Sequence, residues 1–155
     1  MALRRVVVTG LGALTPIGNN IEEYWNGLIN GVSGAAPITY FDASKFKTQF
    51  ACEVKGFDPH VYMDRKEARK MDPFVQYAIA STDEAIKDAG LDFDNLDRTR
   101  IGVIWGSGIG GLTTFTEEVA QFSKGDGTPR FNPFFIPKML IDLAPGYISM
   151  RHGLQ

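Results

Sequence analysis

The sequence predicts an α/β fold, because two short apolar runs alternate with segments that favour helices. Arg5–Thr9 and Ile101–Trp105 are rich in β-branched residues, and a glycine follows each of them. Runs of this kind are typical of strands that are buried on both faces of a sheet. We therefore expect two buried strands, each of which leads through a glycine loop toward a helix.

Capping residues predict where the first helices begin and end. The asparagines at 19–20, with acidic residues just after them, favour a helix start, and the glycines at 31 and 34 favour its end. Asp64 is expected to cap a short basic turn over residues 65–70. Asp72-Pro73 predicts another start, since proline fits the first helical position. That helix is expected to run to about Ala89 and to stop at Gly90.

Two further helices are expected in the last third of the chain. Thr113–Phe122 has helical spacing and the acidic pair Glu117 and Glu118. Lys138–His152 should be largely helical, with Pro145 expected to kink or divide it because proline removes a helical donor.

Composition excludes several classes of protein. Hydrophobic residues make up 44% of the chain, charged residues make up 22%, and the net charge is −2. A nucleic-acid-binding protein usually carries a strong basic field, which is absent here. No apolar run approaches the roughly 20 residues that span a bilayer. The single cysteine, Cys52, permits no internal disulfide and fits a reducing compartment. We expect a cytoplasmic protein that binds neither nucleic acid nor membrane.

The glycine loop 106–111 fits the spacing G-x-G-x-x-G, which occurs in dinucleotide-binding folds. Such a fold needs a second parallel strand after the helix, but residues 129–137 contain three prolines, which do not suit a central strand. A dinucleotide site is therefore the less favoured interpretation. The alternative is that the glycines allow close packing at the strand ends, or let the backbone approach a ligand.

Five segments, in this order and with natural spacing, resemble β-ketoacyl-acyl-carrier-protein synthases of the elongating type II branch. They are Val6–Gly12, Thr15–Gly18, Arg65–Asp72, Gly106–Gly111 and Pro133–Pro137. The resemblance implies a thiolase-like α-β-α-β-α sandwich, with residues 1–155 as most of the first half, an incomplete N-terminal part. It also implies a homodimer that works with acyl carrier protein and needs no cofactor or metal.

The chemistry implied by the resemblance is a decarboxylative condensation. An acyl group moves to a cysteine thiolate, and the carbanion formed by loss of carbon dioxide from malonyl-acyl carrier protein attacks the thioester. Two histidines stabilise the developing charge. In this family those three residues would lie beyond residue 155, so none in this chain is expected to be catalytic. His60 and His152 are expected to have surface or packing roles, and Cys52 is expected to be a small buried residue.

The only dense basic cluster covers residues 65–70. Like charges four residues apart on a helix repel one another by a few tenths of a kcal/mol per pair, and only Glu67 offsets them locally. A solvated helical turn is one interpretation. The resemblance supports another, in which the cluster docks the acidic carrier protein, and we favour this one. The docking residues would be Lys66, Arg69, Lys70 and, as a possible extension, Arg130. Phe131 stands where some relatives have a second basic residue, which weakens that extension.

Three apolar side chains are candidates for an acyl pocket. In the enzymes that this chain resembles, the bulky residue at the position of Ile109 faces the pocket and gates chain length. Phe134 and Phe135 lie between two prolines and suit either a dimer contact or the floor of an acyl tunnel. Simple core packing is the competing interpretation for all three, and for Phe134 it is slightly favoured.

The function expected from the sequence is fatty-acid elongation by a β-ketoacyl synthase. A partner subunit without the cysteine, such as a chain-length factor, would share this first half and remains an alternative. A dinucleotide-binding domain is the other alternative.

Overall fold

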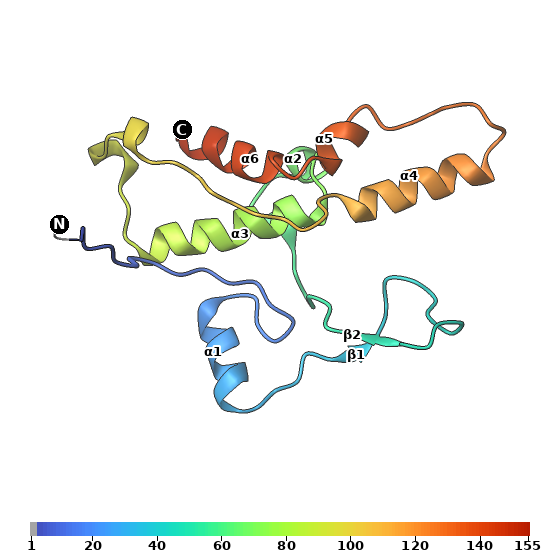
Figure 1. Ribbon diagram of the computed structural model, residues 1–155, viewed down its shortest axis with the longest axis horizontal. Coiled ribbons are helices and arrows are strands. Elements are labelled where there is room, and N and C mark those ends of the chain that lie inside the picture. Colours follow the sequence, from blue (N-terminus) through green and yellow to red (C-terminus); the bar gives the residue numbers. More distant parts are fainter. Residues whose placement is uncertain (1–2) are drawn as a thin grey trace. The chain divides into compact units, whose positions relative to one another are not determined.

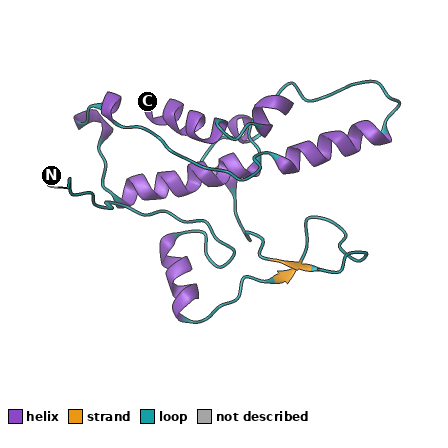
Figure 2. Cartoon of the chain, viewed as in Figure 1, coloured by secondary structure: helices purple, strands orange, loops and turns teal. Residues whose placement is uncertain are grey.

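The computed structural model describes residues 3–155, which form mostly helices and irregular segments (Figures 1 and 2). Short 3-10 helices occupy Pro59–Val61, Phe93–Asn95 and Arg98–Arg100. The other elements, in chain order, are α1 (Ile21–Ile29), β1 (Ala36–Pro37), β2 (Phe50–Ala51), α2 (Arg65–Ala68), α3 (Pro73–Asp88), α4 (Leu112–Lys124), α5 (Phe135–Met139) and α6 (Leu143–His152).

The chain divides into two compact units. The first unit comprises the chain up to Asp58 together with Asp83–Leu91, and the second comprises Pro59–Thr82 together with Asp92–Gln155. Helix α3 therefore contributes its first part to the second unit and its last turns to the first. All candidate site residues belong to the second unit.

The core of the second unit forms where α3 packs against α6. Val75 and Ile79 from α3 and Ile148 from α6 are the largest fully buried side chains. Small residues on the same helices, such as Ala78 and Ala144, are also fully buried, which lets the two helices approach closely. Burial of side chains of this size contributes roughly 1.5–3 kcal/mol each, so this helical core is the main source of stability in the unit.

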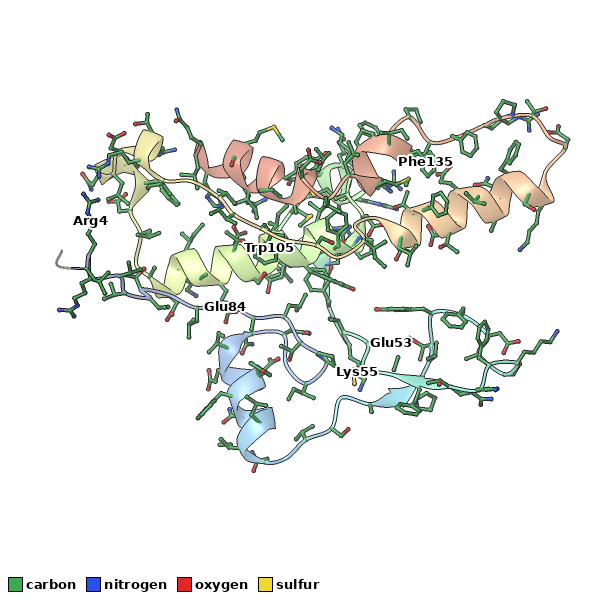
Figure 3. The ribbon with its side chains drawn as sticks, in the orientation of Figure 1. Arg4, Glu53, Lys55, Glu84, Trp105 and Phe135 are labelled. Atoms are coloured by element: carbon green, nitrogen blue, oxygen red, sulfur yellow. The ribbon has the colours of Figure 1, made fainter. Side chains whose placement is uncertain are left out.

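In the first unit, carboxylates from the end of α3 hold the segment that leads into α1. Glu84 accepts from the backbone N–H of Ala13 at 2.9 Å and from that of Ile21 at 2.8 Å (Figure 3). A Cβ on Gly10 would lie 2.3 Å from the Ala85 carbonyl oxygen, so only glycine fits there. The segment that contains Gly10 therefore packs closely against the last turns of α3.

The caps that the sequence predicts are found in the structure. Asn20 precedes α1 and its side chain accepts from the N–H of Glu23 at 2.8 Å. Asp64 caps α2 in the same way, through the N–H of Glu67. Gly31 and Gly90 follow α1 and α3 with φ of 62° each, a left-handed conformation that favours glycine. These boundaries are local, which is why the sequence alone predicts them.

The two predicted buried strands are wrong for this structure. Residues 5–9 form no strand, and Val6 is 90% exposed; Ile104, in the second run, is 98% exposed. The only sheet within residues 3–155 is the antiparallel pair of β1 and β2, in which Ala36 lies opposite Ala51. A strand needs a neighbour to satisfy its backbone groups. Within the described part of the chain, no segment pairs with residues 5–9.

The second apolar run has one backbone partner. The N–H of Gln155 donates to the carbonyl of Ile101 at 3.1 Å, and the N–H of Val103 donates to the carbonyl of Gln155 at 3.3 Å. This is the hydrogen-bond pattern of two parallel strands, in which one residue bonds to both neighbours of its opposite residue. Contact with one residue does not make a strand, but it shows that residues 101–103 have the extended geometry that pairing needs.

The predicted helix over 138–152 is two helices. Helix α5 begins earlier than expected, at Phe135, and α6 ends at His152 as predicted. The chain breaks between them at residues 140–142, not at Pro145. Pro145 is in the first turn of α6, where a backbone N–H has no partner within the helix and its loss therefore costs little.

Candidate functional site

The basic turn, which consists of α2 and the two residues after it, projects its cations into solvent while its other face joins the core. Ala68 is buried, whereas Lys66, Arg69 and Lys70 are exposed. Among residues 3–155, none of these three cations forms an ion pair. Glu67 instead pairs with Arg151 of α6, with 3.5 Å between Oε1 and Nη1. The carboxylate that could have offset the cluster is thus shared with a further cation.

The pKa of Asp64, the cap of α2, is lowered mainly by a backbone hydrogen bond and to a lesser degree by the charges of the cluster. The backbone N–H of Glu67 holds the pKa of this carboxyl below its usual value, and the charges of Lys66 and Lys70 act in the same direction. The turn is therefore stabilised by its cap at neutral pH, where the carboxylate is ionised and accepts from the N–H groups. This cap helps hold four clustered cations in one turn.

Lys70 connects the basic turn to the predicted acyl-pocket aromatics. Its Nζ lies 5.8 Å from the centre of the Phe134 ring. A cation at this distance from an aromatic face is attracted by about 0.5–1 kcal/mol at an exposed site. The structure thus brings together two groups of residues that the sequence assigns to different roles.

Aromatic side chains form a continuous row along α4, the segment after it, and α5. Phe135 is labelled in Figure 3. Its ring stacks on that of Phe131 at 5.4 Å between ring centres and on that of Phe115 at 6.4 Å. Phe122 extends the row through Phe131. Every ring in it except Phe135 is about two-fifths exposed, so the row is a partly open apolar surface and not a closed core.

Helix α4 also fixes the backbone that leads into α5. Glu118 accepts from the N–H of Asn132 at 3.1 Å, and the Asn132 side chain in turn accepts from the N–H of Phe134 at 2.8 Å. Phe134 precedes α5 and Phe135 begins it. The two aromatic residues are therefore held at defined positions although both lie partly in solvent.

The glycine loop 106–111 has one anchored end and one open end. A Cβ on Gly111 would lie 2.2 Å from the Lys138 carbonyl oxygen, and one on Gly110 would lie 2.4 Å from that of Met139. The N–H of Gly111 donates to the Met139 carbonyl oxygen at 3.2 Å. At the other end, a Cβ built on Gly106 or Gly108 would have no atom within 4 Å among residues 3–155, apart from the glycine itself and its chain neighbours. The last glycines therefore serve close packing on α5, the alternative that the sequence left open.

Ile109 lies on the open part of this loop and is 69% exposed. The structure does not place it in a closed core, so core packing within this chain does not account for it. Whether it faces an acyl chain stays a prediction.

A buried carboxylate joins the first turns of α3 and α4. Asp72 is only 2% exposed. One of its oxygens accepts from the N–H of Phe74 at 3.3 Å, and the other accepts from the N–H and the hydroxyl of Thr114 at 2.9 and 2.7 Å. The sequence identifies Asp72 as a helix cap, but the bond to Thr114, 42 positions later, leaves no mark in the local pattern.

Within residues 3–155, Arg130 forms its ion pair with an acidic neighbour and not with the basic turn. Arg130 lies in the segment between α4 and α5, after the C-terminal end of α4. It pairs with Asp126 at 3.3 Å, and both side chains are largely exposed. An exposed pair of this kind contributes little to stability.

The remaining reactive side chains are placed without a catalytic arrangement. Cys52 is exposed, which corrects the expectation that it is buried, because it follows the two-residue strand β2 and no core forms there. His60 is exposed in a 3-10 helix, and the ring of His152 lies 5.4 Å from that of Phe93. In the described part of the chain no three His, Cys, Asp or Glu residues gather as a metal site would require.

None of the helices within residues 3–155 is both long enough and apolar enough to cross a membrane.

Comparison with known proteins covers nearly the whole chain. The family described as "Beta-ketoacyl synthase, N-terminal domain" matches residues 3–155. The chain belongs to the β-ketoacyl synthase family. A curated relative from Vibrio cholerae, "3-oxoacyl-[acyl-carrier-protein] synthase 2", is 46% identical over 157 residues. That match covers 100% of this chain and 37% of the relative, so the chain spans little more than a third of the relative's length.

Solved structures agree on the fold. "The ishigamide ketosynthase/chain length factor" matches with a TM-score of 0.89 and 32% identity, over 99% of this chain and 38% of the other. A second structure, AntDE:AntF, is a type II ketosynthase in complex with its acyl-carrier protein. It matches with a TM-score of 0.76 and 26% identity, over 96% of this chain and 38% of the other. The fold is therefore a partial thiolase-like α/β fold, as the resemblance implies.

Proposed function

We propose that this β-ketoacyl synthase segment acts within a complete synthase that elongates fatty acids. The observation that carries the proposal is the identity of 46% to a 3-oxoacyl-[acyl-carrier-protein] synthase 2 across the full chain. In such an enzyme an acyl group passes from its carrier to a cysteine thiolate and frees the carrier thiol. Malonyl-acyl carrier protein then loses carbon dioxide, and its carbanion attacks the acyl carbonyl to give a 3-oxoacyl carrier protein and the regenerated cysteine.

The described residues contribute binding to this reaction, because the nucleophile and the histidines are expected beyond residue 155. Residues 1–155 would form the N-terminal part of a thiolase-like half in a cytoplasmic homodimer. The exposed aromatic row on α4 and α5 gives that dimer a surface with which to associate, since large open apolar patches mark contact sites.

Docking of acyl carrier protein is proposed for Lys66, Arg69 and Lys70. They project from a capped turn, have no ion-pair partner among residues 3–155, and so present positive charge to an acidic partner. Arg130 is proposed as a minor outer contact, since it is already paired with Asp126.

Binding of the acyl chain is proposed for Ile109, Phe134 and Phe135. Ile109 lies exposed on the open end of the glycine loop. Phe134 precedes α5 and Phe135 begins it, and the other end of the loop packs on this helix. An acyl chain near these residues would meet apolar side chains held by a rigid backbone.

The alternative, a partner subunit related to chain-length factors, would share these elements but lack the cysteine. The curated relatives favour the enzyme, since the first of them bears the name of a synthase across 100% of this chain.

The experiment is an assay of the complete protein that contains this chain, with acyl and malonyl carrier proteins as substrates. We expect a 3-oxoacyl carrier protein and carbon dioxide in equal amounts. A complete protein that binds the carrier but forms neither product would favour the partner subunit.

A further inference from the structure

Asp72 caps two helices at once, and the second of them has no cap of its own. The residue before α4 is Gly111, which provides no side-chain hydrogen bond to the helix. Backbone N–H groups in the first turn of a helix have no partner within the helix, and a carboxylate there is favourable. Asp72 supplies that carboxylate from the start of α3, through the N–H of Thr114 at 2.9 Å.

The contact between Asp72 and Thr114 is buried, and hydrogen-bond donors surround the carboxylate of Asp72. Asp72 accepts from the N–H of Phe74 and from both donors of Thr114, and Thr114 is itself only 5% exposed. A buried carboxylate is costly unless hydrogen bonds satisfy it. Each of these bonds is therefore needed, and charge-assisted bonds of this type are among the stronger ones in proteins.

The position of Thr114 gives the contact its importance. The residue lies in the first turn of α4, directly after the anchored end of the glycine loop. That end is fixed by the Asp72 contact on one side and by the backbone of α5 on the other. The open end of the loop, which carries Ile109, has no such support apart from the Ser107 hydroxyl, which accepts from the N–H of Gly110 at 3.0 Å.

We propose that Asp72 is a positioning residue for acyl-chain selection, which acts through Thr114 to fix the base of the loop that carries Ile109. The inference rests on the proposed role of Ile109 in the acyl pocket. When the base of the loop is fixed, the Ile109 side chain meets the acyl chain at one depth in the proposed pocket. When it is loosened, the loop samples several depths and discriminates less between chain lengths.

The test uses Thr114→Val in the complete synthase, because valine has nearly the same shape but lacks the hydroxyl that donates to Asp72. We expect the ratio of kcat/KM for long and short acyl primers to move several-fold toward unity. Thr114→Ser keeps the hydroxyl and should retain the wild-type ratio. The matched control is Thr116→Val on the same helix, where the hydroxyl donates only to the Leu112 carbonyl of its own helix; it should leave the ratio unchanged.

A second measurement does not depend on turnover. Hydrogen exchange of the peptide that covers residues 106–114 should be faster in Thr114→Val than in wild type, and unchanged in Thr116→Val. Asp72→Asn, which removes the charge and leaves one acceptor oxygen where the carboxylate has two, should show the same changes.

Three results would overturn the inference: unchanged exchange in Thr114→Val, an unchanged primer ratio, or an equal loss of rate at every primer length. Failure of the proposed function gives a different result, since the wild-type protein would then form no 3-oxoacyl product from any primer. If Ile109→Phe alters the primer ratio and Thr114→Val does not, only the positioning role of Asp72 is wrong.

Discussion

The helical core of the second unit and the two apolar extended runs have similar composition but opposite environments. Val75 and Ile79 on α3 are buried, whereas Val6 and Ile104 are almost fully exposed. A helix satisfies its backbone within itself and needs only one apolar face to pack. A strand needs a neighbouring strand before its side chains can be covered. Hydrophobicity therefore does not decide burial in this chain; the availability of a backbone partner does.

The largest expected effect is on the isolated chain. Residues 1–155 alone should show no condensing activity and should aggregate instead of forming a native dimer, because their extended apolar runs and aromatic row are exposed. Light scattering after size-exclusion chromatography measures this, with the complete synthase as the soluble control. Turnover of malonyl-acyl carrier protein by the purified chain would contradict the prediction.

A pair of isoleucines tests the comparison directly. In the complete synthase, Ile79→Ala should lower the free energy of unfolding by about 2–5 kcal/mol, since it leaves a cavity in the helical core. Ile104→Ala removes the same atoms from a side chain that is exposed here. If residues 101–105 pair as a strand in the complete protein, that variant should also be costly.

The measurement for both variants is the urea-unfolding transition. A negligible effect of Ile104→Ala would mean that the run stays in solvent even in the complete protein, and the comparison would then hold beyond this chain. A negligible effect of Ile79→Ala would contradict the core described here.

Ile109 tests whether an exposed side chain next to the second run is reserved for a ligand. Ile109→Phe should fill the mouth of the proposed acyl pocket, so that long primers lose several buried methylenes at about 0.8 kcal/mol each. Short primers should remain competent. Rates against primer length in the complete synthase measure this, together with thermal stability. A uniform loss at all lengths with lower stability would make Ile109 a packing residue.

Charge reversal in the basic turn, which lies on the solvent side of the helical core, has the smallest expected effect. Lys66→Glu combined with Arg69→Glu should weaken carrier-protein binding and reduce its dependence on salt, because exposed charges act by long-range attraction. Activity with a small acyl thioester that lacks the carrier should change little. Binding titrations at two salt concentrations provide the measurement.

Two control variants sharpen this result. Lys45→Glu combined with Lys47→Glu makes the same change of charge at two exposed lysines outside the cluster and should have little effect. Arg130→Glu should have an effect between the two, since Arg130 is exposed but already paired with Asp126. Equal losses with and without the carrier would show that the basic turn is structural.

The sequence by itself determined the features that depend on neighbouring residues. The caps at Asn20 and Asp64 and the ends of α1 and α3 lie where it predicts them, because each is a contact within a few residues. The motifs were also sufficient to indicate the family, since five segments in order are a specific signal.

Only the tertiary structure decided the features that join distant residues. It left the valines at 6–8 in solvent, placed Cys52 at the surface, and paired Arg130 with Asp126. It also brought Lys70 to Phe134 and Asp72 to Thr114. The physical reason is the same in each case: burial, pairing and capping across the fold depend on which elements become neighbours, and a local pattern does not specify its partner.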